Sequence, residues 1–149
     1  MSELATAVGA MLKQKPRQIW SISSAASVYE CLKMMAEKQV GALLVMDHDS
    51  LKGIISERDY ARKVFLLGRS SKDTLVAEIM TSPVVTVTCQ HTIGDCMHIV
   101  TDKRIRHLPV MEGDKVIGLI SIGDLVNWVI NEQQKTIMQL QAYICGTAS

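Results

Sequence analysis

Two short stretches decide the fold of this chain: Gly53-Ile-Ile-Ser-Glu-Arg-Asp59 and Gly118-Leu-Ile-Ser-Ile-Gly-Asp124. Shifting the sequence by 65 residues superimposes them and lays residues 20–65 over 85–130 without a gap, with 11 of 46 aligned positions identical. Solenoid units usually run about 20 to 50 residues in arrays of three or more, so two copies of this length do not fit that class. The chain is therefore predicted to contain a duplicated unit arranged as a pseudo-twofold pair.

Both copies show the same order of local signals. In the first copy a short alternating strand at 20–23 precedes a helix capped by Ser27, strands at 42–46 and 51–55, and a second helix that begins at Ser56. The second copy repeats this order 65 residues later, which makes the unit β-α-β-β-α. Packing the two copies face to face would bury the apolar sheet faces and helix stripes. We therefore expect an α+β fold, with small sheets flanked by helices and a cleft along the internal axis.

The same signals predict the domain organisation. A single amphipathic helix is expected before Lys15-Pro16, and a Gly/Ser/Lys-rich stretch separates the copies. The predicted parts are an N-terminal helix (1–16), a first repeat (17–68), a linker (69–81), a second repeat (82–133) and a C-terminal helix extension (134–149).

The C-terminal helix carries an apolar row with heptad spacing through Gln133. Its members are Val126, Ile130, Ile137, Leu140 and Ile144. The first two have counterparts in the repeat and are expected to pack inside the module, whereas the last three extend past it. They need a cover from the N-terminal helix or from a second subunit, and we favour a homodimer in which identical rows meet.

Composition excludes several classes of function. A net charge of +1 and 4% aromatic residues do not suit nucleic-acid binding. The sequence has neither a run of about 18 apolar residues nor an export signal, so we expect a cytoplasmic protein without membrane contact. Four irregularly spaced cysteines are interpreted as thiols rather than as a disulfide framework.

Cysteine and histidine pairs raise the question of a metal site. Cys89-x-His91 and Cys96-x-His98 offer zinc donors, but Cys96 belongs to an apolar helical stripe and His98 points about 200° around that helix. We predict no metal site. No Ser/His/Asp or Cys/His arrangement suggests nucleophilic catalysis, so catalytic residues are not expected either.

The duplicated motif follows Val40-Gly-Ala-Leu-Leu-Val45 in one copy and Ile105-Arg-His-Leu-Pro-Val110 in the other. This arrangement resembles the cystathionine β-synthase (CBS) domain pair, or Bateman module, over nearly the whole chain. The stretch from Ser56 to Lys63 is similar to a stand-alone bacterial version. The resemblance implies binding of an adenine nucleotide (AMP, ATP or NAD(H)), no catalytic cofactor, and pairing of two modules into a dimer.

Residue chemistry agrees with that implication. A carboxylate in the first helical turn, such as Asp59 or Asp124, can accept from both hydroxyls of a ribose diol. Ser56 and Ser121 stand where a helix start favours a phosphate. The cationic candidates are Arg58, Arg106 and His107. The Ser-x-x-Asp spacing is also that of a capping box, a structural role that can coexist with ligand binding.

The resemblance further implies two sites that each mix both copies. One combines Ser121, Asp124, Arg106, His107 and Pro109 with Ile19, Ser21, Val40, Gly41 and Ala42. The other combines Ser56, Arg58 and Asp59 with Met80, Thr81 and Ile105. Gly123 stands where the first copy has Arg58, so the Asp124 site needs a cation from Arg106, His107 or Lys15 and the two sites are not expected to be equivalent.

The leading functional hypothesis is a non-enzymatic sensor that binds adenine nucleotides for energy or redox sensing. The alternative is a dimerisation or docking module with vestigial clefts that acts on a separate enzyme or transporter. Both hypotheses leave the effector protein on another chain.

Overall fold

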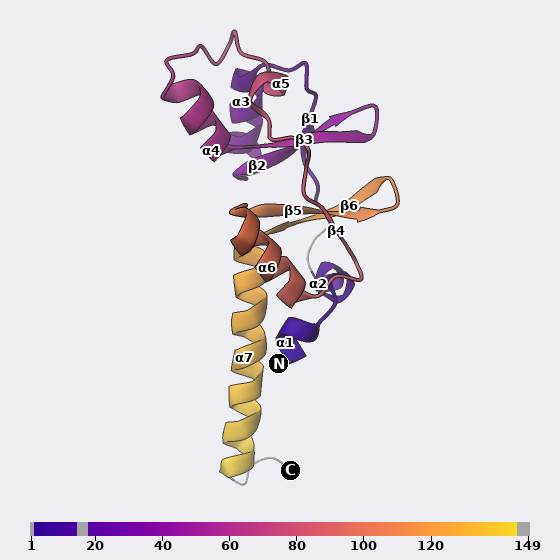
Figure 1. Cartoon of the computed structure of the whole chain (residues 1–149). Helices are drawn as coiled ribbons and strands as arrows, with labels where there is room; N and C mark the ends of the chain where they lie inside the picture. The colour runs from indigo at the N-terminus through magenta and orange to yellow at the C-terminus, as the bar shows by residue number, and fades with distance from the viewer. Residues whose placement is uncertain (1, 15–17, 146–149) are drawn as a thin grey trace. The chain divides into compact units, whose positions relative to one another are not determined.

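The computed structural model describes residues 2–14 and 18–145. The chain divides into two compact units. One unit holds residues 18–85 and 113–117, and the other holds the described parts of 1–17, 86–112 and 118–149. Each repeat contributes one small three-stranded sheet flanked by helices, so the predicted α+β fold class is confirmed (Figure 1).

The first repeat follows the predicted element order. Its elements are β1 (Ser21–Ile22), α3 (Val28–Lys38), β2 (Ala42–Asp47), β3 (Ser50–Ser56), α4 (Glu57–Tyr60), the π-helix η1 (Ala61–Phe65) and, in the linker, α5 (Val76–Ile79). Strand β2 lies between β1, which is parallel to it, and β3, which is antiparallel. The strand predicted at 20–23 is therefore shorter than expected.

Helix α3 shows why the sequence folds as it does. The Ser27 side chain accepts a hydrogen bond from the Glu30 amide, and Gln39 ends the helix in the left-handed conformation with φ 56°. Residues at helical spacing face inward, where Val28, Cys31 and Met35 are buried. They pack with Leu43, Val45 and Ile55 of the sheet and with Val64, Val76 and Ile79 of the following helices.

The second repeat has the same order of elements. They are β4 (Val87–Thr88), α6 (Ile93–Lys103), β5 (His107–Glu112), β6 (Lys115–Ser121) and α7 (Ile122–Ile144), with the strands in the order β4-β5-β6. Thr92 caps α6 as Ser27 caps α3, and Arg104 ends it with φ 54°. The two copies therefore share their helix start and stop signals as well as their apolar pattern.

The N-terminal helix prediction is wrong in one respect. Instead of one helix, the structure has α1 (Ser2–Ala5) and α2 (Val8–Gln14). Between them Ala7 forms an antiparallel bridge with Thr92, because Thr6 O accepts from the Ile93 amide at 2.8 Å and the Val8 amide donates to His91 O at 2.8 Å. These bonds satisfy backbone groups at the start of α6 better than a continuous helix would. Lys15 and Pro16, predicted to stop the helix, lie outside the described residues.

The linker makes the same backbone contacts with the start of α3 as the N-terminal segment makes with the start of α6. Thr74 O accepts from the Val28 amide at 2.8 Å, and the Val76 amide donates to Ala26 O at 2.8 Å. Segments 6–12 and 74–80 are therefore counterparts, related by a shift of 68 residues. The sequence holds a signal for this relationship, since both segments begin Thr-x-Val.

Helix α7, drawn in orange to yellow in Figure 1, runs far beyond the length of its counterpart in the first repeat. Val126 and Ile130 were expected to be buried, but they are 44% and 46% exposed. Leu125 is fully buried instead, because the inward face of α7 lies one residue earlier than the heptad row. All five residues of that row therefore form one exposed apolar face of the helix, with Ile137, Leu140 and Ile144 at 52 to 78% exposure.

Two buried glycines, one in each repeat, allow a matched test of packing. A Cβ on Gly53 would lie 2.9 Å from the backbone oxygen of Thr81, whereas one on Gly118 would meet the Leu12 Cδ2 at 2.9 Å. A methyl group at the end of a flexible side chain can move, but a bridged backbone cannot. We expect Gly53→Ala to destabilise the protein by about 1–3 kcal/mol and Gly118→Ala by clearly less in urea unfolding. Equal losses would contradict the rigid contact at Gly53.

Candidate functional site

The Asp59 carboxylate lies at the start of α4 and is held by Ser56. Its Oδ2 accepts from the Ser56 amide at 3.0 Å and from Ser56 Oγ at 3.1 Å, while the Asp59 amide donates to Ser56 Oγ at 3.2 Å. This is the predicted capping box. It fixes the carboxylate in a single orientation at the end of β3.

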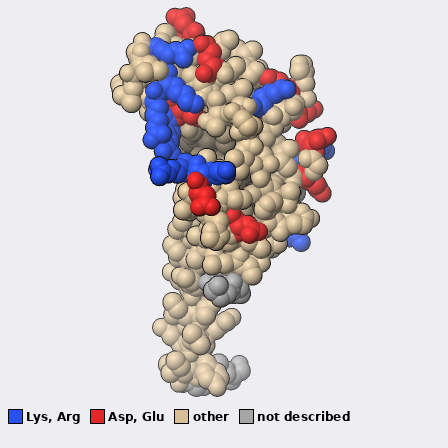
Figure 2. Space-filling view, in the orientation of Figure 1, with Lys and Arg blue, Asp and Glu red and all other residues tan. Residues whose placement is uncertain are grey.

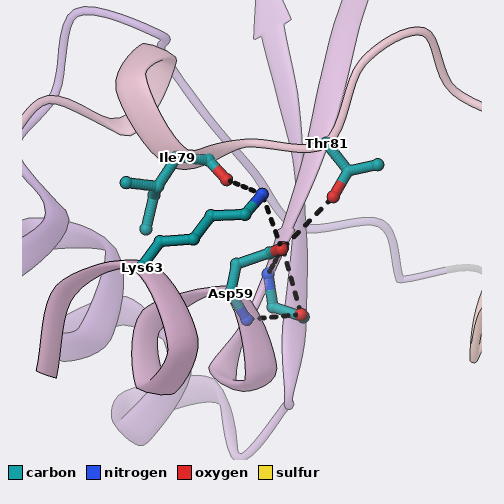
Figure 3. A network of polar contacts seen from close by, with 5 residues as sticks. Asp59, Lys63, Ile79 and Thr81 are labelled. Carbon is teal, nitrogen blue, oxygen red and sulfur yellow. Dashed lines mark hydrogen bonds and ion pairs between the residues drawn. The ribbon is translucent and has the colours of Figure 1, made fainter. Parts of the chain in front are cut away.

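The second carboxylate oxygen faces the linker and the π-helix (Figure 3). Asp59 Oδ1 accepts from Thr81 Oγ1 at 3.2 Å and lies 3.3 Å from Lys63 Nζ. The same ammonium group donates to the backbone oxygen of Ile79 at 2.9 Å. The Asp59 side chain is only 14% exposed and that of Lys63 is 45% exposed.

Backbone contacts bring three segments to this carboxylate. Ile54 and Thr81 exchange two hydrogen bonds of 3.1 and 2.8 Å, which hold the linker beside β3. The Glu57 amide donates to Gly41 O at 3.0 Å, so the start of β2 adjoins the start of α4. A strand start, a helix start and a linker thus meet around Asp59.

The second repeat builds an equivalent helix start at Asp124. Asp124 Oδ2 accepts from the Ser121 amide at 2.8 Å, and Ser121 Oγ accepts from the Asp124 amide at 3.1 Å. The Ile122 amide donates to Arg106 O at 2.8 Å, just as Glu57 does to Gly41. Four residues after Asp124 stands Trp128, whose uncharged ring cannot form the ion pair that Lys63 forms with Asp59. The indole N–H of Trp128 is buried, with no hydrogen-bond partner among the described residues.

The predicted site residues fall in both units. The structure brings Ser56, Asp59 and Thr81 into direct contact and places Met80 and Gly41 against the same segments. The unit that contains Asp59 also holds Ile19, Ser21, Val40, Ala42 and the exposed Arg58. The unit that contains Asp124 holds Ser121, Ile105, Arg106, His107 and Pro109. Ala42 and Pro109 are buried and Arg106 is exposed. That each site combines residues from both repeats stays a prediction.

Sequence reasoning missed two lysines. Lys63 is not among the predicted site residues, although its position four residues after Asp59 is a signal for an ion pair. The second is Lys13. When the match between segments 6–12 and 74–80 is extended by one residue, Lys13 corresponds to Thr81. It is thus a cationic candidate for the Asp124 region, whereas Lys15 lies outside the described residues.

Two basic side chains of the segment after α4 contact other residues of their own unit. Lys and Arg gather along one side of the face shown in Figure 2, with acidic side chains beside them. In the basic segment after α4, Arg69 pairs with Glu78 at 2.6 Å and Lys72 lies over the Tyr29 ring at 5.1 Å. These side chains make contacts within the unit that holds residues 18–85.

The two buried cysteines, Cys31 and Cys96, fit structural roles. Burial raises the pKa of the Cys31 and Cys96 thiols to about 11. The negative charges of Asp59, for Cys31, and of Asp95, for Cys96, add a smaller effect in the same direction. Protonated thiols are poor metal ligands and nucleophiles. His91 accepts from the Thr88 amide through Nδ1 at 3.0 Å, which uses that nitrogen in a turn. Among residues 2–14 and 18–145 no three Cys, His, Asp or Glu side chains cluster as a metal site would require.

Two repeats, each with a Ser-x-x-Asp helix start beside an apolar strand, define the class of tandem α+β repeat modules. Comparison with known families assigns the class: the CBS domain model matches residues 15–65 and 76–131. The chain belongs to the CBS domain family. Within the described residues no helix has the length and apolar character needed to cross a lipid bilayer.

Individual relatives support the family assignment. The mitochondrial CBS domain-containing protein CBSX3 of Arabidopsis thaliana is 44% identical over 80% of this chain, which spans 61% of that relative. CBS domain-containing protein YhcV of Bacillus subtilis is 29% identical, with 77% of this chain and 82% of that protein covered. Among solved structures, a CBS-domain protein from Burkholderia ambifaria MC40-6 is 53% identical with a TM-score of 0.83, covering 86% of this chain and 96% of that one.

Proposed function

We propose that this chain is a regulatory CBS domain pair that binds adenine nucleotides and has no catalytic activity. The observation that carries the proposal is the Asp59 carboxylate, which is fixed by Ser56 and turned toward Thr81 at the meeting point of three segments. Asp124 repeats the helix start in the second copy. Family membership supports the regulatory role, since CBS domains generally bind adenosine ligands.

The chemistry of each carboxylate suits a ribose diol. A carboxylate has about four acceptor positions and can receive both hydroxyls of a diol at once. Hydrogen bonds to a charged acceptor are stronger than those between neutral groups, so the diol gives affinity as well as orientation. Arg58, Arg106 and His107 remain the candidates for contact with phosphate. AMP, ATP and NAD(H) are all candidate ligands, because they share the adenosine part whose ribose the carboxylates would hold.

The second candidate function is a dimerisation or docking module. It is favoured by the exposed row on α7, where Ile137, Leu140 and Ile144 present a continuous apolar face. We propose that this row pairs with a second copy of the chain. A hexameric CBS-CP12 protein from cyanobacteria, 25% identical with a TM-score of 0.75 over 97% of this chain, supports assembly of such folds into oligomers. A cytoplasmic location and a separately encoded effector complete the proposal.

Selectivity for the ribose tests the proposed function. A carboxylate that holds the diol loses one partner when the ligand is a 2′-deoxynucleotide, at a cost of about 1.5–3 kcal/mol for a hydrogen bond to a charged group. We therefore expect 2′-deoxy-AMP to bind at least tenfold more weakly than AMP in isothermal titration calorimetry. Equal affinities of the two ligands would contradict the ribose role of Asp59 and Asp124.

A further inference from the structure

The Asp59 carboxylate is already saturated by donors of its own chain. Ser56 supplies its amide and its hydroxyl to Oδ2, while Thr81 Oγ1 and Lys63 Nζ approach Oδ1. Four donors fill the acceptor positions of one carboxylate. A ribose diol can therefore bind Asp59 through one hydroxyl only if one of these groups withdraws, and through both hydroxyls only if two withdraw.

The four donors differ in their freedom to move. The Ser56 amide belongs to the capping box, and the Ser56 hydroxyl oxygen is held there by the Asp59 amide, so moving either group away would undo the start of α4. The Thr81 backbone is bridged to Ile54. Lys63 reaches Asp59 through a flexible stem and its side chain is 45% exposed, so its ammonium group can turn into water (Figure 3). Lys63 is thus the donor that a diol displaces most readily.

Local backbone structure points to the same residue. Lys63 lies in η1, where the Leu66 amide bonds to Ala61 O, five residues earlier, at 3.0 Å. Such wide turns are rare and are common at functional sites. In the second repeat the corresponding stretch is part of the regular helix α7, and Trp128 takes the place of Lys63.

We propose that Lys63 is a positioning residue that occupies the diol-binding carboxylate in the empty site and thereby sets the ligand selectivity of the Asp59 site. This inference rests on the proposed function. Displacement of Lys63 opposes binding of any diol, but the freed ammonium group also attracts an anionic ligand. The lysine therefore disfavours neutral nucleosides relative to nucleotides. Because Lys63 also donates to Ile79 O, its release removes a hydrogen bond between η1 and α5 of the linker when ligand binds.

The test uses the full chain with Asp124→Ala to silence the second site, and compares adenosine with AMP by titration calorimetry. We expect Lys63→Met to bind adenosine three- to tenfold more tightly, with a smaller gain or a loss for AMP, so that the preference for AMP falls. Lys63→Gln should behave like Lys63→Met, which provides a second variant if one folds poorly. Lys63→Arg keeps the cation and should retain the parent preference.

The outcomes separate the two proposals. The proposed function stands if the Asp124→Ala parent binds AMP and Asp59→Asn weakens that binding. The role of Lys63 is nevertheless overturned if Lys63→Met and Lys63→Gln leave the adenosine affinity unchanged or lower it. If the folded parent binds neither AMP nor adenosine, both proposals fall. A purely structural role would lower the thermal midpoint without moving the ratio of adenosine to AMP affinity, and this result also overturns the inference.

Discussion

Replacing both Asp59 and Asp124 with alanine is expected to remove measurable adenine-nucleotide binding while the chain stays folded. Each carboxylate would accept two hydroxyls of a ribose, and hydrogen bonds to charged groups contribute about 1.5–3 kcal/mol each, so every site should lose at least tenfold in affinity. Loss of the capping boxes at α4 and α7 costs only about 1 kcal/mol of stability per helix. Calorimetric titration with AMP, combined with thermal unfolding, measures both effects.

Asp95 provides the matched control for this experiment. It occupies the same capping-box position in α6, where its Oδ2 accepts from the Thr92 amide at 2.9 Å, but it is not part of either candidate site. Asp95→Ala should therefore lose similar stability and keep the affinity of the parent. If Asp95→Ala weakens AMP binding as much as the Asp59 and Asp124 changes do, or if the double variant binds as tightly as the parent, the site assignment is wrong.

The second large effect is expected at the end of α7. A chain that ends after Gln133 loses Ile137, Leu140 and Ile144, whose apolar side chains are 52 to 78% exposed. A row of this kind on a projecting helix is stabilised when an identical row covers it in a twofold dimer. Sedimentation velocity over a range of concentrations should show dimers of the full chain and predominantly monomers of the shortened chain.

Point variants separate loss of the row from loss of helix length. Changing Ile137, Leu140 and Ile144 to serine should dissociate the dimer as truncation does. Changing Lys135 and Gln139 to serine alters the same stretch of α7 on the side away from the row and should leave assembly intact. A shortened chain that dimerises as strongly as the parent would show that the row is not the interface.

Much of the fold could be predicted because its signals are local and occur twice. Ser27, Thr92, Ser56 and Ser121 begin helices as expected, since a side-chain acceptor before an apolar stripe acts within one turn. The break at Ala7 could not be predicted from amphipathicity, because it depends on a bridge to a residue far along the chain. The burial of Val126 was mispredicted because heptad spacing does not define which helix face packs inward.

The candidate site was predictable to a similar degree. Duplication singled out Ser56 and Asp59, and the family resemblance implied Thr81, which the structure brings to Asp59 by pairing the linker with β3. Lys63 was overlooked because a basic residue on a short helix is usually solvated, whereas its contacts with Asp59 and with the Ile79 carbonyl oxygen show that it is engaged. These residues do not distinguish between AMP, ATP and NAD(H), since under the proposed function they would all contact the adenosine part.

Equilibrium dialysis of the unmodified chain against AMP tests the central claim most directly. The ligand-free protein is first prepared by unfolding and refolding, and its fold is checked by circular dichroism. The account predicts saturable binding with no more than two AMP molecules per chain, reversed by excess ATP or NAD and much less by 2′-deoxy-AMP. A folded chain that binds none of AMP, ATP and NAD would contradict it.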